Sequence, residues 1–182
     1  LNEVKNHLIE LESKIFIDKL RKYKGLKTNK RTLHTIFMGN PGTGKTTIAR
    51  LFGRIMKEYG ILNKGHVIEV SRKDLVGEYT GQTPLKTFSK IKEAFGGIFF
   101  IDEAYSLVKD EKDNYGNEAI DTILKAMEDY RDDFIVIAAG YPEPMKKFID
   151  SNPGLESRFT EKFNFTDYSV EELLKIANIV FN

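Results

Sequence analysis

Residues 39–46 read Gly39-Asn40-Pro41-Gly42-Thr43-Gly44-Lys45-Thr46, and they match the pattern G-x-x-x-x-G-K-[ST] in full. An apolar run over residues 32–38 precedes this stretch, and a helical pattern over residues 46–59 follows it. Because Gly42 and Gly44 carry no side chain, backbone N–H groups can curl around a phosphate there, and the next helix N-terminus favours the same anion. The stretch predicts a phosphate-binding loop between a strand and a helix. A glycine-rich turn without a nucleotide is the alternative.

A second stretch supplies the acidic groups that such a site needs. Residues 98–103 read Ile98-Phe99-Phe100-Ile101-Asp102-Glu103, an apolar strand that ends in two carboxylates. We expect Lys45 to reach the β- and γ-phosphates, and Thr46 and Asp102 to hold Mg²⁺, generally through water. Glu103 can then polarise the attacking water. Either carboxylate alone also fits a solvated strand end, but the pair together with the phosphate loop predicts a nucleotide hydrolase.

Apolar runs alternate with helical patterns along the chain. We expect strands at residues 32–38, 66–70, 97–101, 133–139 and 162–165, and helices at residues 3–24, 46–59, 84–95, 117–130 and 142–149. Residues 169–172 read as a capping box that opens a last helix over residues 170–181. The alternation predicts an α/β fold with a mostly parallel sheet covered on both faces, and a ligand at the carboxyl ends of its strands.

Composition indicates one globular domain. The chain has 182 residues, of which 41% are hydrophobic and 30% charged, enough for one substantial core. Its net charge of +1 gives no global field toward nucleic acid or a membrane. It lacks cysteine and shows neither a long apolar run nor a signal-peptide pattern, so we expect no disulfides, no membrane insertion and a cytoplasmic location. Because the chain begins at Leu1 and the last helical pattern has no stop signal, we expect a piece of a longer protein.

One segment is strongly basic. Eight lysines and arginines lie between Lys14 and Arg31, against Asp18 alone. The run fits a helix C-terminus followed by a solvated loop, and contact with nucleic-acid phosphates is the alternative. The three histidines at positions 7, 34 and 66 are too dispersed to predict a metal site.

Three stretches together resemble AAA+ ATPases. They are GNPGTGKTT at 39–47, DLVGEYTG at 74–81 and FIDEAYSL at 100–107. The branch that the chain resembles is that of stage V sporulation protein K and the red-type rubisco activase, and the similarity spans nearly the whole chain. The resemblance implies a P-loop NTPase fold, with a five-stranded sheet of order 5-1-4-3-2 flanked by helices. It also implies an α/β nucleotide-binding domain over residues 1–166 and the first helix of a truncated helical lid over residues 167–182.

The resemblance also assigns roles to single residues. Nucleotide contacts are implied for Gly39, Asn40, Pro41, Gly42, Thr43, Gly44, Lys45, Thr46, Thr47 and Tyr141. Tyr141 occupies the position where AAA proteins usually carry an asparagine that helps to place the water. A phenol cannot copy an amide's donor and acceptor pair, and packing at the sheet edge is the alternative role. Arg158 is implied to reach a neighbouring subunit's nucleotide as an arginine finger, the alternative being a surface ion pair.

Two more residues carry expectations from the resemblance. Tyr79 is flanked by glycines in the sequence Gly77-Glu78-Tyr79-Thr80-Gly81, which resembles the aromatic pore loop of AAA+ remodelling proteins. Its ring would supply apolar grip on an extended peptide, whereas a tyrosine folded back on its own domain is the alternative. Ser71, at the end of the second strand, is a candidate restraint on Glu103, with a plain turn serine as the alternative.

These inferences combine into one functional hypothesis. The chain is expected to be a Mg²⁺-dependent ATP hydrolase that works as a hexameric ring and remodels a protein partner, with sporulation among the roles near its branch. Lys45 and Glu103 would act within one subunit and Arg158 in the next. One alternative is a nucleotide-gated assembly or binding module with little turnover. The other is a DNA-directed AAA+ machine, for which the basic segment is the sole support.

Overall fold

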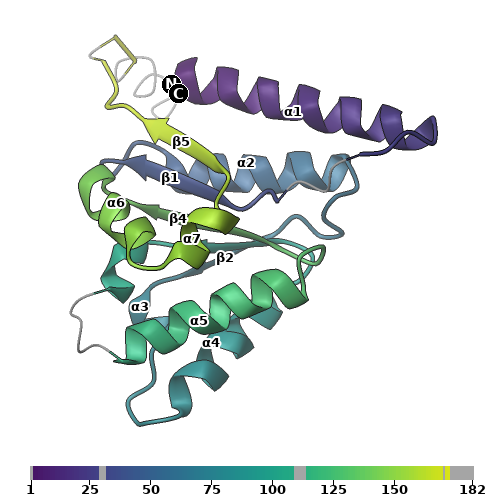
Figure 1. The fold of residues 1–182 in the computed structure, drawn as a ribbon. Coiled ribbons are helices and arrows are strands. Elements are labelled where there is room, and N and C mark those ends of the chain that lie inside the picture. Colours follow the sequence, from purple (N-terminus) through teal and green to yellow (C-terminus); the bar gives the residue numbers. More distant parts are fainter. Residues whose placement is uncertain (1, 29–31, 109–113, 170, 173–182) are drawn as a thin grey trace.

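The computed structural model describes residues 2–28, 32–108, 114–169 and 171–172. A five-stranded parallel sheet of order β2-β3-β4-β1-β5 forms its centre (Figure 1). The strands are β1 (Thr35–Gly39), β2 (Val67–Val70), β3 (Ile98–Ile101), β4 (Ile135–Gly140) and β5 (Glu161–Phe165). The predicted α/β fold and the predicted 5-1-4-3-2 order are therefore confirmed.

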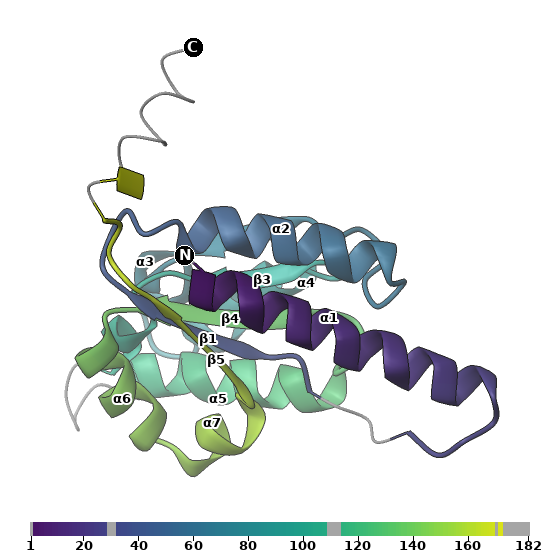
Figure 2. The same cartoon turned by 90° about the horizontal axis from the view of Figure 1, so that it is seen from above.

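Helices cover both faces of this sheet (Figures 1 and 2). They are α1 (Asn2–Tyr23), α2 (Lys45–Glu58), α3 (Arg72–Leu75), α4 (Gln82–Glu93), the 3₁₀ helix η1 (Ala104–Leu107), α5 (Asn114–Asp129), α6 (Pro142–Asp150) and α7 (Pro153–Arg158). One buried cluster joins α1 and α2 to one face of the sheet. A second cluster joins α3 to α7 and η1 to the opposite face.

Successive strand residues alternate between these two clusters. Phe99 packs with the cluster under α4 and α5, whereas Phe100 packs with the cluster under α1 and α2. Every residue of β3 and β4 is buried, as expected for central parallel strands with helices on both faces. The apolar runs that predicted these strands follow from this double burial.

Three short helices and some strand limits differ from the prediction. Helices α3, η1 and α7 are too short to show a helical period. Local caps stabilise two of them, since Ser71 and Asp74 form a capping box and the Asn152 side chain accepts a hydrogen bond from the Gly154 N–H. Strand β1 begins at Thr35 rather than residue 32. Just before it, the imidazole of His34 accepts a hydrogen bond from the Val136 N–H at 3.0 Å, so a side chain satisfies this amide.

The segment after β5 forms the predicted capping box. The Ser169 N–H donates to Glu172 Oε2 at 3.0 Å, and the Glu172 N–H donates to Ser169 Oγ at 3.2 Å. Apart from residues 171–172, the helix expected over residues 170–181 lies outside the described residues, so the division into 1–166 and 167–182 stays a prediction. Within the part of the chain that the structure describes, no helix is long and apolar enough to span a membrane.

Candidate active site

A pocket of about 390 Å³ lies where β1, β3 and β4 end. Its lining residues are Gly39, Pro41, Gly42, Gly44, Lys45, Thr46, Thr47, Asp102, Glu103, Gly140 and Tyr141. The lining comes from the loop between β1 and α2, from the end of β3 and from the end of β4, which are neighbours in the sheet. Most of the residues predicted from the sequence to contact a nucleotide or a metal are thus brought together at the carboxyl edge of the sheet.

The phosphate loop has the backbone shape that an anion needs. Gly42 and Gly44 adopt φ values of 75° and 88°, the left-handed region that favours glycine. A Cβ atom at Gly42 would have no heavy atom within 4 Å, so the loop is open at that point. Helix α2 begins at Lys45, directly after the loop, and its first N–H groups have no partner within the helix. These N–H groups and the open loop fit phosphate oxygens.

The Lys45 side chain is fixed by hydrogen bonds to the backbone of the phosphate loop. Its Nζ donates to the carbonyl oxygens of Gly39 at 2.8 Å and Asn40 at 2.7 Å. Burial lowers the pKa of Lys45, and the negative charge of Asp102 opposes this shift. The ammonium group therefore lies between the loop backbone and the acidic strand end, where phosphate oxygens of a nucleotide can replace the carbonyls.

Asp102 and Glu103 present their carboxylates at the end of β3. Both side chains are exposed and line the pocket with Thr46. The Glu103 N–H donates to Asp102 Oδ1 at 3.1 Å. Glu103 has a φ of 48°, the single non-glycine residue with positive φ among the described residues, and such conformations concentrate at functional sites.

The oxygen donors of this pocket fit Mg²⁺. A hydroxyl from Thr46 and a carboxylate from Asp102 are hard ligands, and Mg²⁺ usually takes its remaining ligands from water and substrate phosphates. No group of three or more histidine, aspartate or glutamate side chains could hold a metal in the described ranges 2–28, 32–108, 114–169 and 171–172. A metal held by Thr46 and Asp102 would have ligand positions left for water and nucleotide phosphates.

Two predicted loop contacts have their side chains directed elsewhere. The Asn40 amide donates to both carboxylate oxygens of Asp167 at 3.0 Å, and Thr43 Oγ1 is buried and donates to the Asn40 carbonyl at 2.8 Å. The Tyr168 hydroxyl donates to the Thr43 carbonyl at 3.0 Å. The segment after β5 thus forms hydrogen bonds with the phosphate loop. Sequence reasoning missed this contact, because about 125 residues separate its partners.

Two tyrosine rings lie near one another at the end of β4, and one of them lines the pocket. Tyr141 lines it, and its ring centroid lies 6.1 Å from that of Tyr105 in η1. Burial raises the pKa of Tyr105, and the charge of Glu103 adds to the shift. Tyr105 was not among the residues predicted from the sequence. Ser71 Oγ donates to Asp74 Oδ2 at 2.8 Å, which matches the turn-serine alternative.

Arg158 and Tyr79 lie away from the pocket. Arg158 ends α7, just before β5. Burial lowers the pKa of His34, at the amino end of β1, and the charge of Arg158 adds to the shift. This is the opposite edge of the sheet from the phosphate loop. Its guanidinium lies 3.6 Å from Glu128 Oε2, and its buried Nε has no hydrogen-bond partner within the described part of the chain. Tyr79, in the loop between α3 and α4, is 68% exposed.

The fold and this pocket define a class of protein, the P-loop nucleotide-binding domains with acidic residues at the end of the strand next to the central one. The AAA family, described as "ATPase family associated with various cellular activities (AAA)", matches residues 35–167. The chain therefore belongs to the AAA family of ATPases, and its domain is that of an ATP hydrolase. The resemblance predicted from the sequence is confirmed.

Curated relatives fall in the predicted branch. The chain is 51% identical to "Stage V sporulation protein K" of Bacillus subtilis (strain 168), over 97% of this chain and 55% of that protein. It is 47% identical to "Ribulose bisphosphate carboxylase/oxygenase activase, chloroplastic" of Cyanidioschyzon merolae (strain NIES-3377 / 10D), over 99% of this chain and 62% of that protein. The chain thus spans little more than half the length of the curated relatives it matches.

A solved structure supports the fold. The FIGL-1 AAA domain, determined in complex with ADP, covers 88% of this chain with a TM-score of 0.62 and 18% sequence identity, over 52% of its own length. At this identity the likeness shows the fold alone.

Proposed function

We propose that this chain hydrolyses ATP with Mg²⁺ and that it works as part of a hexameric ring that remodels a protein partner. The observation that carries the proposal is the meeting of Lys45, Thr46, Asp102 and Glu103 in one pocket at the carboxyl edge of the sheet. A cation for phosphates, two oxygen ligands for a metal and a free carboxylate for water are the groups that phosphoryl transfer to water requires.

Each residue has a distinct task in this proposal. The N–H groups of the phosphate loop and Lys45 bind the triphosphate and fix its orientation. Thr46 and Asp102 would hold Mg²⁺, which when bound would neutralise charge on the β- and γ-phosphates. Glu103 accepts a proton from the attacking water, and its exposed carboxylate leaves room for that water.

Two residues act beyond their own pocket. Arg158 reaches the nucleotide of a neighbouring subunit, a proposal supported by its position at the amino edge of the sheet, where it is too remote to serve its own pocket. Tyr79 grips an extended polypeptide from the central pore, a proposal supported by its exposed ring beside Gly81, which adopts φ 81°.

The partner is proposed only as a class. A relative that shares 47% identity is named as an activase of ribulose bisphosphate carboxylase/oxygenase, which makes a folded protein a reasonable substrate class for this chain. Action on a protein partner, hexameric assembly and a cytoplasmic location remain predictions. Identification of proteins that co-purify with the Glu103→Gln variant and dissociate on nucleotide removal would name the partner.

The test of the hydrolysis proposal is the Glu103→Gln variant. An amide cannot accept the proton, so turnover is expected to fall by about 10²- to 10⁴-fold while ATP affinity stays within about twofold. Glu143→Gln, the same change on an exposed carboxylate that pairs with Lys146 in α6, is the matched control and should leave turnover unchanged. Unchanged hydrolysis by Glu103→Gln would show that Glu103 is not the base.

A second candidate is a nucleotide-gated binding module with little turnover. Tyr141 favours it, because the phenol that lines the pocket offers no amide to place a water. Steady-state hydrolysis by a chain of full length, measured at dilute and at assembling concentrations, separates the two. Turnover that rises with assembly supports the hydrolase, whereas ATP-dependent assembly without turnover supports the module.

A further inference from the structure

The segment after β5 stays beside the phosphate loop. Strand β5 lies next to β1, and their register pairs Phe165 with Gly39, the last residue of each strand (Figures 1 and 2). A Cβ atom on Gly39 would lie 2.6 Å from the Phe165 carbonyl oxygen, so the two chains are in close contact. The Asp167 carboxylate then accepts hydrogen bonds from the amide of Asn40, the next residue of the loop. The pairing of the two strands therefore continues beyond the sheet as side-chain contacts.

Tyr168 contacts the part of the loop that leads into α2. Its hydroxyl donates to the Thr43 carbonyl oxygen at 3.0 Å. A Cβ atom on Gly44 would lie 2.8 Å from the same hydroxyl oxygen, so the phenol lies against both residues that share this peptide group. Position 44 therefore requires glycine for two reasons, its φ of 88° and the close approach of Tyr168.

A hydrogen bond to the carbonyl of a peptide group also fixes the direction of its N–H. The group is planar and trans, so the Thr43 C=O and the Gly44 N–H point in opposite directions. Because Tyr168 binds the carbonyl, the Gly44 N–H points away from the tyrosine. Gly44 lines the pocket, and Tyr168 is not among the described residues that line it. As the N-cap of α2, the Gly44 N–H has no partner within the helix and can donate to an anion.

We propose that Tyr168 is a positioning residue for nucleotide binding, whose hydroxyl holds the peptide between Thr43 and Gly44 so that the Gly44 N–H faces the phosphates. The inference rests on the proposed function, in which the loop binds the triphosphate of ATP. Tyr168 acts through the loop backbone and does not touch the nucleotide in this scheme. Without the hydroxyl, the peptide turns more freely because glycine accepts many backbone conformations, and a turned peptide presents its carbonyl oxygen to the phosphates.

Nucleotide binding by Tyr168→Phe tests the inference, because this change keeps the ring and removes the hydroxyl. The dissociation constant for ATP should rise about tenfold, since a misdirected N–H loses one hydrogen bond to a charged phosphate. KM for ATP should rise in parallel while kcat stays within about twofold, because the loop binds the substrate and the transition state alike. Tyr130→Phe, which removes a hydroxyl from a ring packed on Phe88 and Phe95, is the matched control and should leave these constants unchanged.

A spectroscopic readout observes the peptide group itself without turnover. The 182-residue chain contains two Thr-Gly pairs, Thr43-Gly44 and Thr80-Gly81. Labelling threonine with ¹³C at the carbonyl and glycine with ¹⁵N therefore gives two carbonyl-to-amide correlations. Tyr168→Phe should move the 43–44 signal and leave the 80–81 signal in place. Addition of ATP should move the 43–44 signal further in the original protein than in the variant at the same ATP concentration.

The outcomes separate this inference from the proposed function. An unchanged dissociation constant for ATP in Tyr168→Phe would overturn the inference, and so would an unmoved 43–44 signal or a loss confined to kcat or to Tm. If Glu103→Gln hydrolyses ATP at the original rate while Tyr168→Phe binds ATP more weakly, the proposed role of Glu103 fails and the role of Tyr168 stands.

Discussion

Polar side chains have different roles at the carboxyl edge and at the amino edge of the sheet. At the carboxyl edge, Asp102 and Glu103 are exposed, Lys45 rests on backbone carbonyls, and Glu103 has a left-handed backbone conformation. At the amino edge, His34 is only 2% exposed and accepts a hydrogen bond from the Val136 N–H. The carboxyl edge keeps its polar groups available to a ligand, whereas the amino edge uses them to close the fold.

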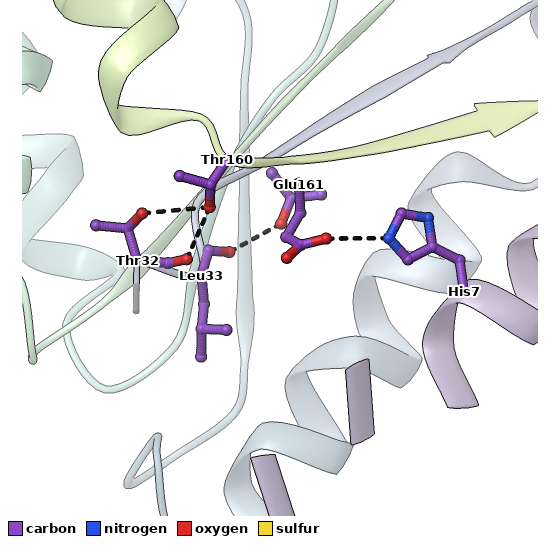
Figure 3. Close-up of polar contacts among 6 residues, drawn as sticks. His7, Thr32, Leu33, Thr160 and Glu161 are labelled. Carbon is purple, nitrogen blue, oxygen red and sulfur yellow. Dashed lines mark hydrogen bonds and ion pairs between the residues drawn. The ribbon is translucent and has the colours of Figure 1, made fainter. Parts of the chain in front are cut away.

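Figure 3 shows how the amino edge is closed. Thr160 Oγ1 donates to the Thr32 carbonyl at 3.0 Å, which joins the chain before β5 to the chain before β1. His7 of α1 lies 3.0 Å from Glu161 Oε2, and its ring stacks on Phe163 with centroids 4.1 Å apart. Changes at this edge should therefore alter stability, and changes at the carboxyl edge should alter chemistry. Arg158 departs from this rule, since the proposal gives a residue of the amino edge a chemical task.

The largest expected effect is a loss of hydrolysis on substitution of Arg158, which would make this amino-edge residue an exception to the rule. In Arg158→Ala, hydrolysis by the assembled protein should fall by about 10³- to 10⁵-fold, roughly 4 to 7 kcal/mol, because the γ-phosphate loses a cation supplied in trans. Stability should change by less than about 1 kcal/mol, since the ion pair with Glu128 is 3.6 Å long and partly exposed. ATPase assays and thermal unfolding measure the two effects.

Mixing experiments show whether Arg158 acts in trans. Arg158→Ala subunits keep Glu103, and Glu103→Gln subunits keep Arg158, so mixed assemblies should recover hydrolysis that neither variant has alone. Arg131→Ala is the matched control, because Arg131 also pairs with Glu128, at 2.9 Å, and should retain full turnover. Failure of the mixture to recover activity, with assembly verified, would assign Arg158 to the ion pair only.

The sequence predicts the carboxyl edge better than the amino edge. Gly42, Gly44 and Lys45 are recognisable because phosphate binding dictates residue types at fixed short spacings. Glu103 is recognisable because it follows Asp102 at the end of an apolar strand. The sheet order followed from the resemblance, and the strands followed from double burial. Contacts at the amino edge join residues such as His7 and Glu161, 154 positions apart, and no local pattern encodes such a pair.

The same limit explains what was missed near the pocket. Tyr105 lies only two residues from Glu103, yet its ring packs against Gly140 from another strand. The hold of Asp167 and Tyr168 on the phosphate loop likewise requires the end of β5 to lie beside β1. Spacing along the chain identifies groups that bind a ligand, but the residues that position them become visible only when the strands are assembled.

The second expected effect is a pH dependence of the free energy of unfolding that arises from His34 at the amino edge. Burial lowers the pKa of His34 to about 4, and the charges of Arg158 and Arg131 add to the shift. Between pH 6.5 and pH 4 the unfolded chain therefore binds a proton that the folded chain refuses, so the free energy of unfolding falls as pH falls. The loss should approach about 3 kcal/mol by pH 4.

Comparison with His34→Asn isolates this contribution from the carboxylates that titrate in the same range. Asparagine can accept the Val136 N–H and carries no titrating proton, so its stability should decline less steeply over the same pH interval. Urea unfolding at several pH values measures both curves. Parallel curves for the two proteins would mean that His34 does not titrate as its burial requires.

The smallest expected effect tests whether the two edges are independent. Thr160→Val keeps the shape of the side chain and removes the hydroxyl that donates to the Thr32 carbonyl. Because the site is exposed and water can replace the donor, the cost should be about 0.5 kcal/mol, a lowering of Tm by about 1 to 2 °C. Turnover per assembled subunit should stay the same. A Thr160→Val variant with unchanged Tm that hydrolysed ATP several-fold more slowly would contradict the independence of the two edges. It would show that a change at the amino edge alters the pocket at the carboxyl edge.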